Sequence, residues 1–279
     1  MDGFVNLHKP AGMTSHDAVN RVRKIFMTRK VGHAGTLDPA ASGVLPVAVN
    51  RATKFLEYLS AREKSYRAEI LFGTATNSGD LDGEVVARAE NFSVTVDEIK
   101  SALKFFVGEI EQTPPKFSAI KIHGRKAYDL ARKNLDFDMP TRRVKIFRLE
   151  LVDATDISAT IDVDCSAGTY IRSLAVDLGA RLNLPATLKK LIRLRVGDFT
   201  LADSVTFDEL DESCLRPIDA CLKHLPKFNL PERRIRAFMN GLPTTVNSAD
   251  ENFLRVMSGG KFLGVGKISN GELRSTKIV

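Results

Sequence analysis

The chain has 279 residues, of which 43% are hydrophobic and 27% charged, and its formal net charge is +7. This length and balance predict a globular protein with one large domain and one small one. No apolar run approaches the length that spans a bilayer and no secretory pattern opens the chain, so we expect neither a membrane protein nor a secreted one. The positive charge favours a polyanionic partner such as RNA, although a basic enzyme without such a partner fits it equally well.

The three cysteines are Cys165, Cys214 and Cys221, and they show no metal-binding spacing. An odd count without a disulfide framework is typical of reduced thiols, so we expect a cytoplasmic protein. The sequence also lacks a GxGxxG fingerprint and a Gly-Lys-Ser/Thr phosphate loop, and we expect no nucleotide cofactor.

The N-terminal segment predicts a short strand at residues 4–7, a turn at 8–12 and then an amphipathic helix. Thr14 or Ser15 can cap this helix, because a side-chain oxygen there can accept from the free amides of the first turn. A basic face of the helix leads directly into residues 32–46. A solvated face would also explain these charges, but their position favours a role in binding. The basic residues are Arg21, Arg23, Lys24, Arg29 and Lys30.

Residues 32–46 contain three glycines, two prolines, one histidine and a single acid. Because glycine lacks rigidity and proline lacks a donor, this stretch predicts neither a regular helix nor a central strand. We interpret it as a constrained loop that presents His33 and Asp38, with Pro39 restricting the backbone of Asp38. A turn in which Asp38 only accepts from neighbouring amides explains the pattern equally well.

The next segment predicts a buried strand at residues 44–49, a short helix at 52–59 and a half-buried strand at 64–73. Tyr66 opens the apolar face of that last strand, and a core position is the simplest interpretation of it. The polar loop at residues 74–84 resembles a calcium loop only superficially. Aligning its Gly83 with the invariant EF-hand glycine places Ser78 and Ala89 where carboxylates belong, so we expect no metal.

Residues 112–128 interleave basic, aromatic, Gly and Pro residues, between a predicted helix at 96–107 and predicted strands at 144–149 and 157–165. This mixture suits a loop that grips a nucleic-acid backbone, and an ordinary surface hairpin is the alternative. The density of positive charge favours contact with a polyanion. The charges are Lys116, Lys121, Arg125, Lys126, Arg132 and Lys133.

A turn at residues 166–169 leads into a predicted helix with Tyr170 and Arg172 in its first turn. The helix dipole disfavours a cation there, so Arg172 is better explained by an acidic partner. Basic residues with apolar inserts continue through 188–199, and residues 217–222 close the larger unit. After a break, a basic helix and glycine-punctuated strands predict a small β-rich module. Its elements are expected at residues 232–238, 253–257, 261–268 and 272–278.

Taken together, five segments resemble the TruB family of pseudouridine synthases, which isomerise uridine-55 in the T arm of tRNA. Their order and spacing extend over roughly residues 3 to 200. The segments are Lys9-Pro10-Ala11-Gly12 with Ser15, residues 32–39 with 43–45, Lys64-Ser65-Tyr66, Pro114-Pro115 with Ser118, Ala119, Lys121 and Gly124, and Gly168-Thr169-Tyr170-Ile171-Arg172.

The resemblance implies a role for each matching position. Asp38 would be the nucleophile, Tyr66 the aromatic that stacks on the flipped uracil and takes part in proton transfer, and Arg172 the basic partner of Asp38. His33 would help to evert the T loop. Further substrate contacts are implied at Tyr170, Leu191, Lys9 and Lys121.

The resemblance also implies an α+β fold over residues 1–225, with a mixed, largely antiparallel sheet and flanking helices, and a PUA-like RNA-binding domain over 226–279. An insertion at about 115–140 would close on the RNA arm. The implied enzyme is a monomer that binds tRNA and needs no cofactor, metal or guide RNA. Two alternatives are a guide-dependent relative inside a ribonucleoprotein and an RNA-binding or tRNA-folding protein without catalysis. The basic insertion and short tail favour the stand-alone enzyme.

These implied roles agree with the chemistry of uridine isomerisation. The base must leave its stack, at a cost of a few kcal/mol that aromatic stacking offsets. A carboxylate can then act as the nucleophile, provided that it stays ionised in a closed pocket. Arg172 would oppose the rise in the pKa of Asp38 that desolvation causes.

Overall fold

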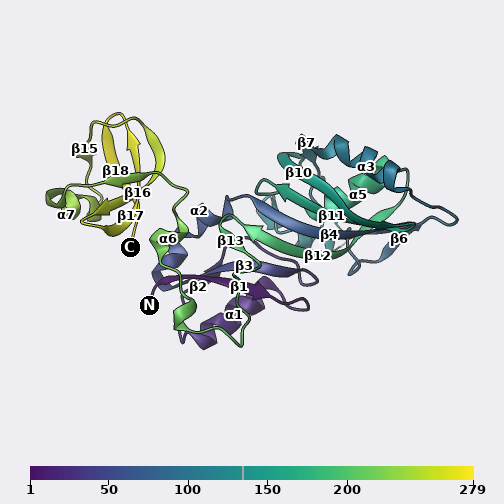
Figure 1. The fold of residues 1–279 in the computed structure, drawn as a ribbon, viewed down its shortest axis with the longest axis horizontal. Coiled ribbons are helices and arrows are strands. Elements are labelled where there is room, and N and C mark those ends of the chain that lie inside the picture. Colours follow the sequence, from purple (N-terminus) through teal and green to yellow (C-terminus); the bar gives the residue numbers. More distant parts are fainter. Residues whose placement is uncertain (134) are drawn as a thin grey trace.

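The protein was analysed as a computed structural model that describes residues 1–133 and 135–279. A nine-stranded mixed sheet forms its main body (Figure 1). Strands β3 and β12 pair in parallel, and the other neighbours pair antiparallel. The expected α+β fold with a mixed, largely antiparallel sheet is therefore confirmed. In spatial order the strands are β1 (Gly3–Lys9), β3 (Ser42–Val49), β12 (Ala186–Val196), β4 (Lys64–Phe72), β11 (Ser158–Cys165), β10 (Arg142–Thr155) and β7 (Gly108–Gln112), with β2 (Val31–His33) on β3 and β13 (Phe199–Thr200) on β12.

The large sheet buries a different core on each side, because successive side chains of a strand point to opposite faces. The larger core takes Val5 and Leu7 from β1 and the apolar sides of three helices, α1 (Ser15–Ile25), α3 (Val96–Leu103) and α5 (Ile171–Arg181). The second core takes Phe4, which precedes Val5 on β1 and points to the opposite face. It also contains residues of η1 (Asn50–Phe55), α2 (Leu56–Ser60) and α6 (Ile218–Cys221).

The N-termini of two of these helices follow from their sequences. Thr14 caps α1 and Thr95 caps α3, each with its side chain accepting from the third residue of the helix. In turn, the side-chain carboxylates of Asp17 and Glu98 accept from the backbone N–H of the capping threonine, which completes a capping box at both helices. Thr14 rather than Ser15 is therefore the cap.

Several short elements lie in the connections between the strands and helices of the main body. The predicted insertion at about 115–140 contains a two-stranded ribbon and one helical turn, and it includes residue 134, which lies outside the described residues. The remaining short elements are β5 (Thr74–Thr76), β6 (Val85–Arg88), η2 (Lys104–Phe106), β8 (Lys121–Ile122), β9 (Arg125–Lys126), α4 (Ala127–Ala131) and η3 (Glu212–Cys214).

The C-terminal segment forms its own five-stranded sheet, at the yellow end of the chain in Figure 1. Its core gathers Leu230, Phe238, Leu254 and Leu273, among others. The expected β-rich C-terminal module is confirmed. Its elements are β14 (Lys227–Asn229), η4 (Glu232–Arg234), α7 (Ile235–Met239), β15 (Thr244–Thr245), β16 (Glu251–Ser258), β17 (Lys261–Ser269) and β18 (Glu272–Ile278), in the spatial order β14-β16-β17-β18-β15.

The buried strand expected at residues 44–49 is confirmed as most of β3, whereas the loop assigned to residues 32–46 is shorter than expected. The segment begins in β2 and finishes in β3, a strand inside the large sheet. Pro46 is tolerated in β3 because it falls between the residues that pair with β12 and those that pair with β2. Its carbonyl accepts from Ala34 N–H at 2.9 Å. Only the residues between β2 and β3 form the constrained loop, and they include Asp38.

Two of the predicted helices are present but are α-helical over only part of their length. The helix expected at 96–107 is helical as α3 and then tightens into η2, and the one expected at 52–59 is η1 followed by α2. Tyr170 caps the N-terminus of α5 instead of lying in its first turn. Among the helices of residues 1–133 and 135–279, none is long and apolar enough to span a membrane.

Candidate active site

A cavity of about 950 Å³ opens where the Asp38 loop, β4, β12, the start of α5 and the insertion meet. Side chains from the first third of the chain and from its second half share its wall, so the fold brings together residues that are far apart in sequence. Six of the eight predicted site residues line the cavity. They are His33, Asp38, Tyr66, Tyr170, Arg172 and Leu191.

The loop that carries Asp38 is fixed by buried side chains on either side of that residue. Ser15 holds Leu37 with two bonds, its Oγ donating to the Leu37 carbonyl at 2.9 Å and accepting from the Leu37 N–H at 2.8 Å. Lys9 lies behind Pro39, and its Nζ contacts the Pro39 carbonyl at 3.5 Å. The backbone on both sides of Asp38 is therefore held in place, which fixes where the carboxylate can point.

Arg172 is the nearest cation to Asp38, and its side chain is only 7% exposed. Its Nε lies 3.0 Å from Asp38 Oδ2 as an ion pair rather than an aligned hydrogen bond. Its Nη1 donates to the Ser78 carbonyl at 3.0 Å and lies 3.4 Å from Asp80 Oδ2. Its Nη2 donates to the Phe117 carbonyl at 3.0 Å. One guanidinium thus joins the Asp38 loop, the loop of Asp80 and the base of the insertion.

The electrostatics of Asp38 are set by opposing effects. Its side chain keeps 38% of its surface open to the cavity, yet the surrounding protein desolvates the carboxylate enough to raise its pKa. Arg172 and Lys9 lower the pKa, and Asp80 and Asp82 raise it. The net direction of the pKa is upward, and the positive charge of Arg172, the nearest cation to Asp38, is the main effect that opposes this rise and favours the charged form of Asp38.

Tyr66 lies on β4, opposite Val163 of β11 on one side and Arg193 of β12 on the other. The ring is buried within the larger core and reaches the cavity wall. Burial raises the pKa of its phenol and the positive charge of Arg193 opposes that rise. Tyr66 is therefore both a core residue, as the alternation of β4 indicated, and a cavity residue.

Tyr170 is positioned through its backbone. Its N–H donates to Gln112 Oε1 at 2.7 Å, and its carbonyl accepts from Gln112 Nε2 at 3.0 Å. Its ring faces the cavity with the Arg142 guanidinium carbon 5.4 Å from the ring centroid. Gln112 ends β7, so the sheet edge directly fixes the start of α5.

Of the four remaining predicted site residues, two lie on the cavity wall and two do not. His33 and Leu191 lie on the cavity wall, and burial lowers the pKa of His33, so its ring is neutral at pH 7. Lys9 is fully buried and donates to the Pro10 and Met13 carbonyls, both at 2.8 Å. Lys121 is exposed on β8. In the described structure neither lysine lines the cavity, which sets both apart from the residues that do.

The amino-acid sequence matches two family models. The model described as the N-terminal domain of TruB family pseudouridylate synthases covers residues 23–171, and the one described as pseudouridine synthase II TruB, C-terminal, covers residues 226–279. The chain belongs to the TruB family. The resemblance on which the sequence analysis relied is thereby confirmed.

Curated relatives match this TruB chain along nearly its whole length. A protein of Trichormus variabilis named tRNA pseudouridine synthase B is 40% identical, with 98% of this chain and 97% of the relative covered. A Bacillus pumilus protein of the same name is 46% identical over 86% of this chain and 82% of the relative. A solved H/ACA ribonucleoprotein bound to a substrate RNA shares the fold, with a TM-score of 0.75, 24% identity, and coverage of 99% of this chain and 84% of the other.

Two residues of the TruB cavity escaped the sequence analysis. Asp80 belongs to the polar loop that was considered only for calcium, and its carboxylate instead faces Arg172. Arg193 belongs to the basic run at 188–199, and it is buried between Tyr66 and the Asp38 loop. The only local signal for Asp80 was a group of acids without a metal-binding pattern. Within residues 1–133 and 135–279, no group of three or more His, Cys, Asp or Glu side chains could hold a metal ion.

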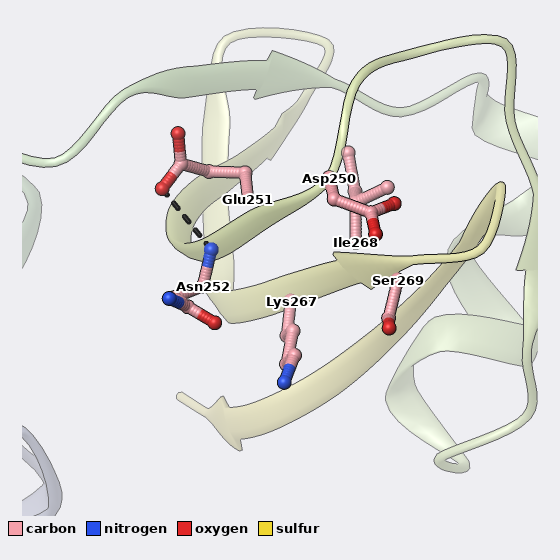
Figure 2. A pocket seen from close by; sticks show the side chains of 6 residues that line it. All are labelled: Asp250, Glu251, Asn252, Lys267, Ile268 and Ser269. Carbon is pink, nitrogen blue, oxygen red and sulfur yellow. Dashed lines mark hydrogen bonds between the residues drawn. The ribbon is translucent and has the colours of Figure 1, made fainter.

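A second, smaller hollow lies on the C-terminal sheet between β16 and β17, and Figure 2 shows its side chains. Its polar contacts stay within residues 250–270: Asn252 N–H donates to Glu251 Oε1 at 3.1 Å, and Asn270 N–H donates to Asp250 Oδ1 at 2.9 Å. The side chains of Glu251 and Lys267 point away from each other in Figure 2. The chemistry of the TruB chain is therefore concentrated at the Asp38 cavity.

Proposed function

We propose that this chain converts the uridine at position 55 of tRNA to pseudouridine, as a stand-alone enzyme with Asp38 as its nucleophile. The Asp38–Arg172 ion pair in the wall of a cavity that also presents Tyr66 carries this proposal. The relatives named tRNA pseudouridine synthase B support tRNA as the substrate, because two of them match this chain over more than four fifths of its length.

The reaction is an isomerisation, so the atoms of the uridine balance without a cofactor. The N1–C1′ glycosidic bond breaks, the uracil turns within the cavity, and a C5–C1′ bond forms. The proton on C5 is lost and N1 gains one. Asp38 supplies the nucleophilic carboxylate, and Arg172 keeps it ionised and oriented.

The flipped base needs an aromatic surface and a cavity large enough to turn in. Tyr66 provides the surface, because its ring is fixed in the core and one side of it faces the cavity. Tyr170 and Leu191 enclose the remaining apolar wall. His33 is neutral and lies at the end of β2, where it can fill the space that the extruded base leaves.

The two lysines have different roles in this proposal. Lys9 supports the Asp38 loop from behind, because its ammonium is fully buried and bonded to three carbonyls of residues 10, 13 and 39. Lys121 is exposed on the ribbon of the insertion and binds the RNA backbone. The insertion touches Arg172 through the Phe117 carbonyl, so the RNA-binding segment and the ion pair are directly linked.

Residues 1–225 form the catalytic domain in this proposal, and residues 226–279 form a separate PUA-like domain that binds tRNA. The exposed arginines Arg233 and Arg236 of η4 and α7 supply positive charge on that domain. The enzyme acts as a monomer, in the cytoplasm, where its three free thiols stay reduced.

A guide-dependent activity is the second candidate, because two solved structures with the same fold come from H/ACA ribonucleoproteins. The two candidates differ in what the purified chain does alone. A stand-alone enzyme needs only tRNA, whereas a guide-dependent one needs a further RNA and further proteins.

The purified chain should be incubated with an unmodified tRNA transcript, and pseudouridine should then be mapped along that transcript. We expect conversion at the T-loop uridine alone, no conversion with Asp38→Asn, and none when that uridine is replaced by cytidine. Conversion only after a guide RNA is added would favour the second candidate, and tRNA binding without any conversion would contradict both.

A further inference from the structure

Arg193 is a buried cation that the reaction described above does not use. It lies on β12 with a relative exposure of 1%, and it is the largest of the fully buried side chains. In the described part of the chain, no carboxylate lies within 4.0 Å of its guanidinium. A buried charge without a counter-ion is costly, so a fold that keeps one at its active site needs a compensating arrangement.

That arrangement is a set of three main-chain carbonyls around the Asp38 loop. Arg193 Nη2 donates to the Gly35 carbonyl at 3.0 Å and Nη1 to the Thr36 carbonyl at 3.2 Å. Nε donates to the Val44 carbonyl at 2.7 Å. One guanidinium therefore binds the loop just before Asp38 and the strand just after it.

The backbone of Arg193 is as closely fitted as its side chain. Gly43 pairs with Arg193 across the parallel β3–β12 contact and has a φ of +108°. A Cβ built on Gly43 would lie 2.3 Å from the Arg193 carbonyl oxygen. Only glycine accepts both the close approach and that conformation, so the strand that leaves the Asp38 loop lies directly against Arg193.

Arg193 also faces Tyr66, its antiparallel partner on β4. The register of β12 against β4 shifts immediately afterwards, between Arg193 and Arg195. Such bulges are found beside active sites, where they redirect a side chain. The positive charge of Arg193 opposes the effect of burial on the pKa of Tyr66, and it acts on Asp38 as well.

We propose that Arg193 is a positioning residue for the isomerisation: it fixes the Asp38 loop through the Gly35 and Thr36 carbonyls and places a permanent positive charge beside Tyr66. The inference rests on the proposed function, since it assigns Arg193 to the reaction carried out at this cavity. Both parts of the role follow from arginine chemistry. The guanidinium is always charged, and its planar fork of donors reaches several carbonyls at once, whereas a lysine brings the charge without the fork.

Two variants separate these parts. Arg193→Lys keeps the charge and loses the fork, and Arg193→Gln loses both. Arg195 is the matched control, because it lies on the same strand, is more exposed, and bonds Ser65 Oγ at 3.0 Å and the Gly197 carbonyl at 3.2 Å. Arg195→Lys and Arg195→Gln should change neither the rate nor its pH dependence.

The experiment measures single-turnover conversion of a tRNA transcript, tRNA affinity and thermal unfolding for all four variants. For Arg193→Lys we expect a rate about 100-fold below that of the wild type, since small misplacements of reacting groups cost that much, with tRNA affinity within about threefold. A wild-type rate for Arg193→Lys would overturn the proposal, as would a loss of affinity as large as the loss of rate. All four variants are compared with the wild type, so the test of Arg193 requires an active wild type. A wild type that does not convert tRNA would count against the proposed function and not against the role of Arg193.

A second readout does not depend on activity. Ionisation of Tyr66 is followed by ultraviolet absorbance, as the difference between the wild type and Tyr66→Phe. The same difference, with and without Tyr66→Phe, is measured in the Arg193→Gln and Arg193→Lys variants. We expect Arg193→Gln to move the Tyr66 transition to higher pH and Arg193→Lys to leave it nearly unchanged. If the transition stays in place in folded Arg193→Gln, the charge of Arg193 has no role beside Tyr66. If Arg193→Gln does not fold, Arg193→Lys alone still decides whether the fork matters.

Discussion

The Nε atom of Arg172 lies 3.0 Å from Oδ2 of Asp38, and this pair joins a loop near the N-terminus to the first turn of a helix in the second half of the chain. The same guanidinium also faces Asp80 at 3.4 Å. With two carboxylates sharing one cation, Arg172 must be correctly oriented for Asp38 to act as the proposed nucleophile. Its surroundings make it sensitive to even a conservative substitution.

Replacement of Arg172 by Lys should lower the single-turnover rate by about 100-fold, because an ammonium cannot reach Asp38, Asp80 and the Phe117 carbonyl together. Arg172→Met should lower it further and shift the acid limb of the rate–pH profile to higher pH, since burial, Asp80 and Asp82 would then raise the pKa of Asp38 against Lys9 alone. The profile is measured from pH 5 to 8 under single-turnover conditions. An unshifted acid limb in Arg172→Met would mean that Arg172 does not control the ionisation of Asp38.

Asp38→Asn should abolish isomerisation and leave tRNA affinity within about tenfold, because binding depends on phosphate contacts elsewhere. Equal losses of affinity and activity would count against Asp38 as the nucleophile. Glu84 also lines the cavity and makes no contact with Arg172, so Glu84→Gln serves as the matched control and should stay active.

The same variant tests the pKa of Asp38 through stability. The pKa is raised in the folded state, so the folded chain holds this proton more tightly than the unfolded chain, and stability is lost as pH rises above the usual value of 3.8. At pH 7 Asp38→Asn should therefore melt higher than the wild type, by roughly 1–2 °C because the carboxylate is partly solvated. The gain should disappear below pH 3.8. If Asp38→Asn melts lower than the wild type at pH 7, the attraction of Arg172 for the Asp38 carboxylate outweighs the cost of its burial.

Tyr66→Phe tests whether the phenol takes part in proton transfer. The ring would still stack on the base, so tRNA affinity should hold and only steps that need the hydroxyl should slow. We expect a loss of about 100-fold in the single-turnover rate. Tyr58→Phe is the control, because the Tyr58 hydroxyl contacts Thr276 at 3.3 Å and lies outside the cavity lining. A wild-type rate for Tyr66→Phe would leave Tyr66 with stacking alone.

The sequence could predict residues whose local pattern conflicts with a purely structural role. Asp38 stood alone among residues that break regular structure, and Arg172 was a cation at the wrong end of a helix. The alternation of β4 correctly placed Tyr66 on its buried face. The local sequence marked these residues as candidates, and the resemblance to the TruB family was needed to place all three at one site.

Other parts of the fold depend on contacts between distant segments. Arg193 was not singled out within the basic run at 188–199, because the carbonyls that bind it lie more than 140 residues earlier in the chain. The strand at 44–49 was expected, but its place inside the sheet despite Pro46 was not, because β12 pairs with residues 42–43 and β2 with residues 47–49 of that edge. Gln112 gave no signal at all, because its partner is the backbone of Tyr170.

Lys64 and Lys9 should make stability depend on pH in the alkaline range. Burial and the charge of Arg193 lower the pKa of each to about 8. The folded chain therefore releases these protons before the unfolded chain does, and stability should rise between about pH 8 and 9. Above pH 9 the buried thiols of Cys165 and Cys221, whose pKa values are raised to about 11 and 12, oppose this rise.

Melting temperatures at pH 7, 8 and 9 check this prediction, with an expected rise of about 2–4 °C for the wild type. Lys64→Met should show about half of that rise, because only Lys9 remains. Lys189, which is exposed and paired with Glu69 at 2.7 Å, is the control, and Lys189→Met should keep the full rise. A melting temperature that falls steadily from pH 7 to 9 would contradict the lowered pKa values.

The C-terminal sheet packs against the catalytic unit through a continuous apolar contact. Val265 belongs to the second core of the large sheet, and the Phe55 and Phe262 rings lie 5.6 Å apart. An ion pair of 2.9 Å between Arg255 and Asp219 borders this contact. Deleting residues 226–279 would uncover Phe55, so a truncated chain should melt lower than the wild type and aggregate on heating.

The RNA-binding role of the C-terminal domain is therefore better tested on its outer face, with the fold left intact. Arg233 and Arg236 are both exposed, and Arg233→Gln with Arg236→Gln should weaken tRNA binding while leaving the single-turnover rate at saturating enzyme unchanged. If both arginines bind phosphates, the slope of log affinity against log salt should become shallower by about 2. Lys223→Gln, an exposed charge just before the domain, is the matched control. An unchanged slope with an unchanged melting temperature would remove this face from the tRNA-binding surface, because the loss of two phosphate contacts must reduce the number of counterions released.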